Sequence, residues 1–148
     1  MIKSHIPDAI RALILDMDGV LWRAEEPIGD LPAIFRQIEA RRLKVVFATN
    51  NATRTAEMYV ERLAGFGVRV EPWQVVTSAM AAAHILSKRF PHGGPVFAIG
   101  ERGIMDALHK EGFTALPVAE APAAQAVLAG IDRQITFEKV REATLLVR

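Results

Sequence analysis

Short apolar runs alternate along the chain with segments in which apolar residues recur every three or four positions. The runs are typical of β-strands, which we expect at residues 11–16, 44–49, 68–70, 96–99, 114–116 and 126–130. The periodic segments are typical of amphipathic helices, which we expect at residues 31–42, 56–64, 79–90, 103–111 and 137–147. Strands that alternate with helices of about 10 to 13 residues indicate an α/β protein with parallel sheets.

Polar residues and chain-breaking residues set the boundaries of these elements. Asp30, Thr55 and Ser78 are expected helix N-caps, because their side-chain oxygens can accept hydrogen bonds from the first turn. The runs at 11–16 and 44–49 are continuously apolar, which predicts strands buried on both faces. The sequence Pro-His-Gly-Gly-Pro at 91–95 is the strongest loop signal and indicates two α/β units.

Composition excludes several classes of protein. A net charge of +1 argues against a nucleic-acid binder, which would carry a basic face, and no segment has the roughly 18 apolar residues of a membrane span. The first 16 residues contain no uninterrupted apolar core, so no signal peptide is expected. The absence of cysteine excludes a disulfide scaffold, a thiol nucleophile and thiolate metal sites, and it fits a cytoplasmic protein.

Two acidic residues, Asp16 and Asp18, end the first apolar run, where ligands bind in parallel α/β sheets. At about 4 Å and an effective dielectric of about 20, two carboxylates repel by about 4 kcal/mol, which a divalent cation or a shared proton would offset. Gly19 permits a tight turn whose N–H groups can approach an anion. From this spacing alone, an acidic turn with one carboxylate capping the next helix is an equal alternative.

The run at 44–49 leads into a second polar cluster, Thr49-Asn50-Asn51. Its hydroxyl and two amides are neutral donors that suit phosphate oxygens. On a neighbouring parallel strand they would stand about 5 Å from the two acids. An asparagine-rich turn before a helix is the alternative for this segment, but two strands that end in polar clusters favour a shared site.

The paired clusters resemble the motifs of the haloacid dehalogenase superfamily of aspartate-dependent phosphatases. The first motif of that family, a strand closing in D-x-D-G, matches DMDGV at 16–20, and the second, a strand ending in Thr or Ser, matches FATNN at 47–51. Its 4-nitrophenyl, phosphoglycolate and pyridoxal phosphate phosphatase branch is also similar at TNNATRT (49–55), VVTSA (75–79) and LAGIDRQITFEK (128–139). The resemblance implies the N-terminal part of a Rossmann-like core at 1–78, followed by part of an α/β cap at 79–148.

The resemblance also implies Mg²⁺-dependent hydrolysis of a small phosphomonoester through a phospho-aspartate. Asp16 would be the nucleophile and Asp18 the acid/base. Magnesium would be held by a carboxylate oxygen of Asp16 and the backbone carbonyl of Asp18. The phosphoryl group would be held by the side chains of Thr49, Asn50 and Asn51 and by the backbone around Met17 and Gly19. The implied partner is a small phosphorylated metabolite, and assembly into a homo-oligomer is compatible with the sequence.

Part of the family pattern lies beyond the sequence. The family also uses a lysine and a second acidic motif, both further along the chain than Arg148. We therefore expect the sequence to end inside the cap, and one alternative is an incomplete fragment that binds phosphate or metal without turnover. The other alternative is a phospho-accepting receiver domain, which normally carries its acceptor on a later strand, where no such Asp follows here.

Overall fold

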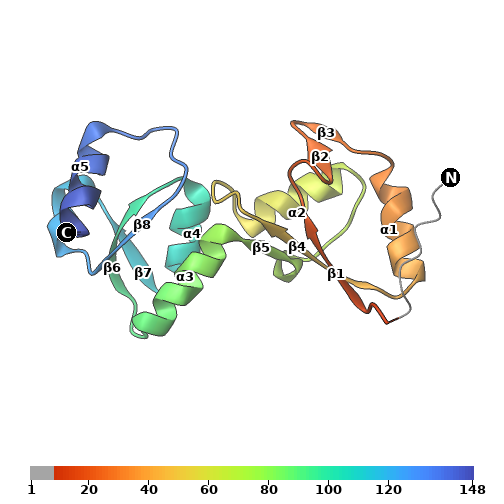
Figure 1. The fold of residues 1–148 in the computed structure, drawn as a ribbon, viewed down its shortest axis with the longest axis horizontal. Coiled ribbons are helices and arrows are strands. Elements are labelled where there is room, and N and C mark those ends of the chain that lie inside the picture. The colour runs from red at the N-terminus through yellow and green to blue at the C-terminus, as the bar shows by residue number, and fades with distance from the viewer. Residues whose placement is uncertain (1–8) are drawn as a thin grey trace. The chain divides into compact units, whose positions relative to one another are not determined.

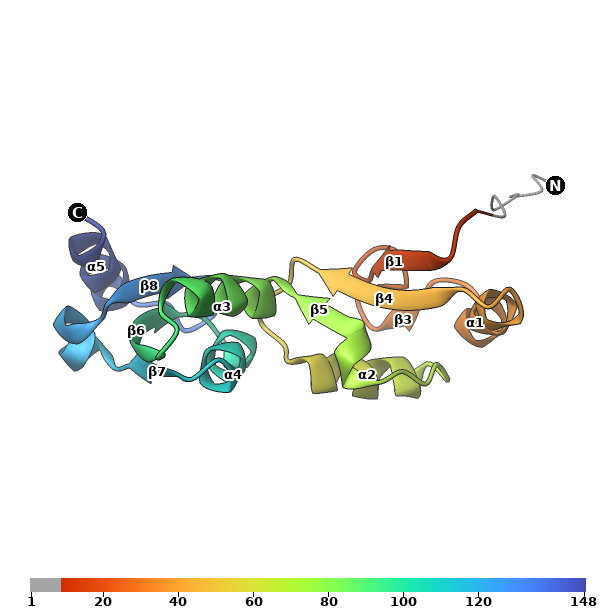
Figure 2. The same ribbon diagram turned by 90° about the horizontal axis from the view of Figure 1, so that it is seen from below.

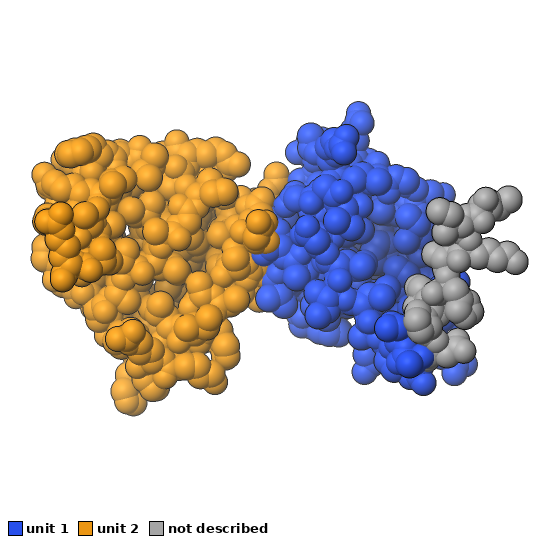
Figure 3. Space-filling model, viewed as in Figure 1, with its two compact units in different colours: residues 1–49, 59–76 blue, residues 50–58, 77–148 orange. Residues whose placement is uncertain are grey.

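The computed structural model describes residues 9–148 and has a mixed α/β architecture with parallel sheets, as the sequence predicts (Figure 1). The chain divides into two compact units, Met1–Thr49 with Tyr59–Val76 and Asn50–Met58 with Thr77–Arg148 (Figure 3). The division expected between residues 78 and 79 stays a prediction. In the described residues, no helix has the length and apolar character needed to span a membrane. The prediction about a signal peptide depends on residues 1–8, which lie outside the described residues.

The first unit is built around a parallel β-α-β arrangement of β1 (Ala12–Asp16), α1 (Leu31–Ala40) and β4 (Lys44–Thr49), with β1 and β4 side by side in Figure 2. Asp30 caps α1 as predicted, since its side chain accepts a hydrogen bond from the N–H of Ala33 at 3.0 Å. The helix ends two residues earlier than the apolar pattern predicts. Arg42 takes a left-handed conformation (φ +55°) that an α-helix cannot continue.

The prediction that β1 is buried on both faces is wrong. Its residues alternate between exposed and half-buried, and the Ile14 side chain is 78% exposed. In the described residues the sheet has the order β1-β4-β5, and β4 is the strand that pairs with β1 there. The same prediction holds on only one face of β4, where Val45, Phe47 and Thr49 are buried.

The predicted strand at 68–70 is also wrong. The third strand of this sheet is β5 (Val75–Thr77), which follows a short 3₁₀ helix, η1 (Pro72–Gln74). Beside β4, the Gln74 side chain donates its amide N–H to the carbonyl oxygen of Val45 at 2.9 Å. A side chain thus takes up a strand carbonyl, and pairing with β4 begins only after it.

The first unit also contains a two-stranded hairpin and most of a third element, a helix that begins in the second unit. The hairpin consists of β2 (Trp22–Arg23) and β3 (Glu26–Pro27), which pair antiparallel. The helix is α2 (Ala56–Gly65), one residue longer than predicted. Leu63 of this helix is fully buried.

The second unit holds a parallel sheet of order β7-β6-β8. Its elements in chain order are α3 (Ser78–Arg89), β6 (Gly94–Ile99), α4 (Arg102–Lys110), β7 (Phe113–Leu116), the 3₁₀ helix η2 (Val118–Ala123), β8 (Ala126–Ala129) and α5 (Phe137–Leu146). The N-cap of α3 is Thr77, whose side chain accepts a hydrogen bond from the N–H of Met80 at 3.2 Å. The expected cap, Ser78, is instead the first helical residue.

Two apolar clusters stabilise the second unit. One joins α3 and α4 to the sheet through buried residues that include Ala83, Ile104 and Leu108. The other is centred on Phe97 and Ile99 of β6, with Leu146 of α5 packed against it. Apolar side chains of β6 therefore enter both clusters, which accounts for the burial of its last four residues.

Candidate active site

The chain leaves β1 through a tight loop that carries four of the predicted site residues. Met17 is fully buried, and the two acids on either side of it, Asp16 and Asp18, are exposed. Gly19 adopts φ +83°, a left-handed conformation that glycine tolerates best. The Leu21 N–H donates to the carbonyl oxygen of Met17 at 2.9 Å and closes the turn. The buried Met17 thus anchors a loop whose carboxylates remain accessible.

Each acid accepts one hydrogen bond inside the loop. The Met17 N–H donates to Oδ1 of Asp16 at 2.8 Å, and the indole Nε1–H of Trp22 donates to Oδ1 of Asp18 at 2.8 Å. The Gly19 N–H donates to the carbonyl oxygen of Trp22 at 2.8 Å. The two N–H groups predicted to hold phosphate, those of Met17 and Gly19, therefore serve protein oxygens. Their role toward phosphate stays a prediction and requires an exchange of these bonds.

Thr49 ends β4 and lies at the same sheet edge as Asp16. The two strands are parallel neighbours, and Asp16 pairs with Ala48, so Thr49 is one residue beyond the partner of Asp16. Thr49 is buried, with 6% of its surface exposed. The first unit therefore brings Thr49 to the strand end that carries the acidic loop, which is where α/β sheets bind ligands.

Asn50 and Asn51 belong to the second unit, where they shape a loop. Oδ1 of Asn51 accepts hydrogen bonds from the N–H of Thr53 at 3.0 Å and from the Thr53 hydroxyl at 2.7 Å, as in an Asx turn. The carbonyl oxygen of Asn50 accepts a hydrogen bond from the Ser78 hydroxyl at 2.8 Å. Phosphate oxygens accept hydrogen bonds, so Asn51 could hold phosphate only through its amide nitrogen. That Asn51 holds phosphate stays a prediction.

The loop after β4 is packed tightly against α4. The Gly103 N–H donates to the carbonyl oxygen of Thr53 at 3.1 Å. A Cβ at residue 103 would lie 2.4 Å from the carbonyl oxygen of Ala52 and 2.5 Å from that of Arg54. No real Cβ atom makes contacts this short, so the approach of the loop to α4 requires glycine at this position.

An ion pair joins the start of α2 to the end of α4. Lys110 Nζ lies 2.8 Å from Oε1 of Glu57 and 2.9 Å from Oδ2 of Asp106. The hydrogen bond from Lys110 lowers the pKa of Glu57 from 4.5 to about 2, and the two carboxylates raise the pKa of Lys110. Both members of the Glu57–Lys110 pair are half exposed, so solvent screens most of their attraction.

One residue without a predicted catalytic or binding role contacts the acidic loop, and a second one packs behind it. Trp22 bonds directly to Asp18, and Arg62 stacks on the ring of Trp22 with its guanidinium carbon 4.6 Å from the ring centroid. Trp22 closes the run DMDGVLW at 16–22, which is similar to the phosphatase branch named above, but a tryptophan in this position is more often a packing residue. Arg62 gives no sequence signal, because it lies far along the chain, on α2.

The oxygen donors of the acidic loop fit part of a magnesium site. Mg²⁺ prefers carboxylate and carbonyl oxygens and usually keeps several waters beside one or two carboxylates and substrate phosphates. The loop offers the exposed carboxylate of Asp16 and the backbone carbonyl of Asp18. Within the described part of the chain, no cluster of three or more His, Cys, Asp or Glu residues could hold a metal. The loop thus supplies the oxygen donors of a partial shell.

Comparison with known proteins identifies the family of the chain. Residues 13–114 match the haloacid dehalogenase-like hydrolases. The chain is 29% identical to phosphoglycolate phosphatase 1A of Arabidopsis thaliana, covering 98% of this chain and 45% of that protein. It is 31% identical to the acid sugar phosphatase of Staphylococcus aureus, covering 93% and 52%. The chain spans about half the length of the curated relatives that it matches.

Solved structures agree with this assignment. A 4-nitrophenylphosphatase from Thermotoga maritima superimposes with a TM-score of 0.84 at 27% identity, covering 95% of this chain and 52% of that one. The glycerol phosphate phosphatase of Mycobacterium tuberculosis, solved in complex with magnesium, gives a TM-score of 0.81 at 28% identity and covers 92% and 40%. The chain belongs to the haloacid dehalogenase-like hydrolase family.

Proposed function

We propose that the protein containing this chain hydrolyses a small phosphomonoester, with Asp16 as nucleophile and Asp18 as general acid and base. The observation that carries the proposal is the Asp16-Met17-Asp18-Gly19 loop at the carboxyl end of β1, beside Thr49 at the end of the neighbouring parallel strand. The relatives support the substrate class, because their names specify phosphoglycolate, acid sugar and glycerol phosphate phosphatases.

The reaction proceeds in two displacements at phosphorus. A carboxylate oxygen of Asp16 attacks the phosphorus atom, the bond from phosphorus to the substrate oxygen breaks, and Asp18 donates a proton to that leaving oxygen. Water then attacks the phosphorus of the aspartyl-phosphate, Asp18 takes a proton from the water, and the bond to Asp16 breaks to release inorganic phosphate. Covalent catalysis thereby replaces one difficult step with two easier ones.

Phosphate recognition in this proposal uses neutral donors. The hydroxyl of Thr49 and the amides of Asn50 and Asn51 hold phosphoryl oxygens, together with the N–H groups of Met17 and Gly19. Neutral donors suit these positions, because they bind phosphate oxygens without neutralising the two acids.

Asp16, through a carboxylate oxygen, and Asp18, through its backbone carbonyl, would hold Mg²⁺. When bound, the ion neutralises charge on the phosphoryl group and orients it toward Asp16. The carboxylate of Asp18 is then available for proton transfer, since the metal contact uses its main chain.

The test is 4-nitrophenyl phosphate hydrolysis by the protein in its natural full length, with Mg²⁺ and with a chelator. We expect Mg²⁺-dependent turnover in the parent and none in Asp16→Asn, whose amide is neither a nucleophile nor a good ligand. Borohydride reduction during turnover should convert Asp16 to homoserine, detectable by peptide mass spectrometry. Asp30→Asn is the matched control, because Asp30 is an exposed carboxylate that caps α1. Parent-rate turnover by Asp16→Asn would refute the mechanism.

A further inference from the structure

Trp22 makes two contacts with the acidic loop, one from its side chain and one from its main chain. Its indole Nε1–H donates to Oδ1 of Asp18 at 2.8 Å, and its carbonyl oxygen accepts from the Gly19 N–H at 2.8 Å. A β-bridge pairs Asp18 with Trp22. The side-chain and main-chain bonds therefore act on the same turn, and both link it to the first residue of β2.

The indole itself is held firmly in place. Trp22 is 1% exposed, stacks on Tyr59 with ring centroids 6.2 Å apart, and contacts the tilted ring of Phe66 at 5.8 Å. Both of these aromatic residues follow the loop by about forty positions in the sequence and pack onto the hairpin from α2 and its C-terminal end. A ring buried on this scale has few alternative orientations, so its N–H direction is fixed.

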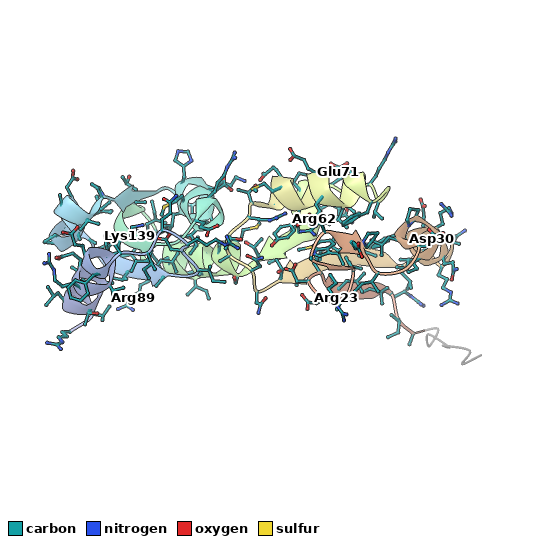
Figure 4. All side chains as sticks on the ribbon, turned by 90° about the horizontal axis from the view of Figure 1, so that it is seen from above. Arg23, Asp30, Arg62, Glu71, Arg89 and Lys139 are labelled. Atoms are coloured by element: carbon teal, nitrogen blue, oxygen red, sulfur yellow. The ribbon has the colours of Figure 1, made fainter. Side chains whose placement is uncertain are left out.

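Arg62 packs against the indole ring of Trp22. Its guanidinium lies over Trp22 at 4.6 Å, donates a hydrogen bond to the carbonyl oxygen of Ala24, and pairs with Glu25 at 3.5 Å. Figure 4 shows Arg62 between α2 and the β2–β3 hairpin. Its Nε is buried and finds no hydrogen-bond partner in residues 9–148, so the contacts to Trp22, Ala24 and Glu25 hold the guanidinium.

From this geometry we infer that Trp22 is a positioning residue for the carboxylate of Asp18, an inference that rests on the function proposed above. Asp18 is exposed and could take its hydrogen bond from water, whereas the buried Trp22 N–H needs an acceptor in the protein. The indole bonds Oδ1 and leaves Oδ2 as the oxygen for proton transfer. A fixed donor thus selects one orientation of a side chain that would otherwise sample several.

The hydrogen bond can be tested without any activity, by NMR of the indole N–H. These 148 residues contain two tryptophans, and Trp73 is 72% exposed, so Trp73→Phe removes the other indole signal of this segment, and the signal lost in Trp22→Phe is assigned to Trp22. We expect that signal to move upfield in Asp18→Ala, where the indole N–H loses its acceptor. A Trp22 resonance with the same chemical shift in Asp18→Ala as in the parent would overturn the inference.

The effect on catalysis is tested by changing the leaving group. An alkyl phosphate such as glycerol phosphate needs a proton from the general acid, whereas 4-nitrophenolate leaves readily without one. For Trp22→Phe in the full-length protein, we expect kcat/KM to fall about tenfold more for the alkyl phosphate than for 4-nitrophenyl phosphate. In a protein that already carries Asp18→Asn, adding Trp22→Phe should not change the ratio of the two kcat/KM values further.

Phe35→Leu is the matched control, because it loosens aromatic packing against Phe47 in the same unit and leaves the ring contacts of Trp22 in place. It should lower the melting temperature while the ratio of the two kcat/KM values stays at the parent value. An unchanged ratio in Trp22→Phe, or an equal change in Phe35→Leu, would overturn the positioning role. If Asp18→Asn itself leaves the ratio unchanged, the proposed acid/base role fails, and the indole chemical shift in Asp18→Ala still decides whether Trp22 holds Asp18.

Discussion

At the residue scale, the conformation of Gly19 governs how the acidic loop turns. Its φ of +83° is unfavourable for any residue with a Cβ, although a Cβ there would meet nothing within 4 Å. We expect Gly19→Ala to lower the free energy of unfolding by about 1 kcal/mol through backbone strain alone. Urea unfolding measures this loss.

Gly112 offers a matched control for that prediction. It has φ +82°, also with open space around its Cβ position, and it lies in the second unit, outside the candidate site. Gly112→Ala should lose a similar amount of stability and keep the parent phosphatase activity. Gly19→Ala should lose activity as well, since the turn sets the positions of the acids. Equal activity in the two variants would contradict a role of this turn in catalysis.

A second prediction at this scale concerns Asp18. Asp18→Asn keeps the size of the side chain and its ability to accept the indole hydrogen bond, but it cannot transfer a proton. We expect turnover of 4-nitrophenyl phosphate to fall about 10²-fold or more, the usual effect of removing a general acid or base. Binding of inorganic phosphate, measured by calorimetry with Mg²⁺ present, should persist. A parent-like rate would exclude Asp18 as the acid/base.

Local sequence patterns predict some of the residues that lie together at the candidate site and miss others. The pairing of Asp16 with Ala48 follows from two apolar runs that each end in polar residues, so the proximity of Thr49 could be anticipated. The bond from Trp22 to Asp18 and the stacking of Arg62 depend on how the hairpin meets α2. No local pattern encodes a contact between residues 40 positions apart.

At the element scale, the sequence predicts the start of a helix well where a side chain caps it. It predicts a strand poorly where the strand's neighbours in the sheet decide its place. The Asp30 cap and the limits of β4 agree with the apolar pattern. The strand expected at 68–70 does not form; the third strand of the sheet is β5, which begins directly after Gln74, whose amide donates to the Val45 carbonyl oxygen. The apolar pattern of residues 12–16 does not show which strands lie beside β1, so it does not reveal how much of this strand is exposed.

Because the 50–55 loop packs tightly on α4, adding one methyl group at residue 103 should lower the stability of the fold. Gly103→Ala would press a Cβ against two backbone carbonyl oxygens, which cannot rotate away as a side chain can. We expect a loss of about 1 to 3 kcal/mol in the free energy of unfolding, the usual range for overpacking. Gly65→Ala, at the end of α2 with nothing within 4 Å, is the control and should be neutral or slightly stabilising. Comparable losses in both variants would rule out the steric explanation.

The Glu57–Lys110 pair predicts a pH dependence of stability. Since the folded pKa of Glu57 is about 2 against an ordinary 4.5, its contribution is fully present above about pH 4.5 and disappears as the pH falls toward 2. We expect Glu57→Gln to destabilise the protein by less than about 1 kcal/mol at pH 7, because the pair is half exposed. The difference from the parent should vanish near pH 2 and shrink in 1 M salt. A difference that grows on acidification would contradict this assignment.

At the scale of the whole molecule, the division into two units predicts that core substitutions act locally. Phe47 is fully buried in the first unit and Leu108 in the second. Phe47→Leu and Leu108→Val each remove buried methylene volume, and each should cost roughly 1 to 2 kcal/mol in the unit that carries it. Native-state hydrogen exchange reports opening segment by segment, so it can locate the loss. Phe47→Leu should speed exchange in β1 and β4 and leave β6 and β8 as in the parent, while Leu108→Val should do the reverse. Equal acceleration across both sheets in either variant would mean that the two units unfold as one cooperative structure.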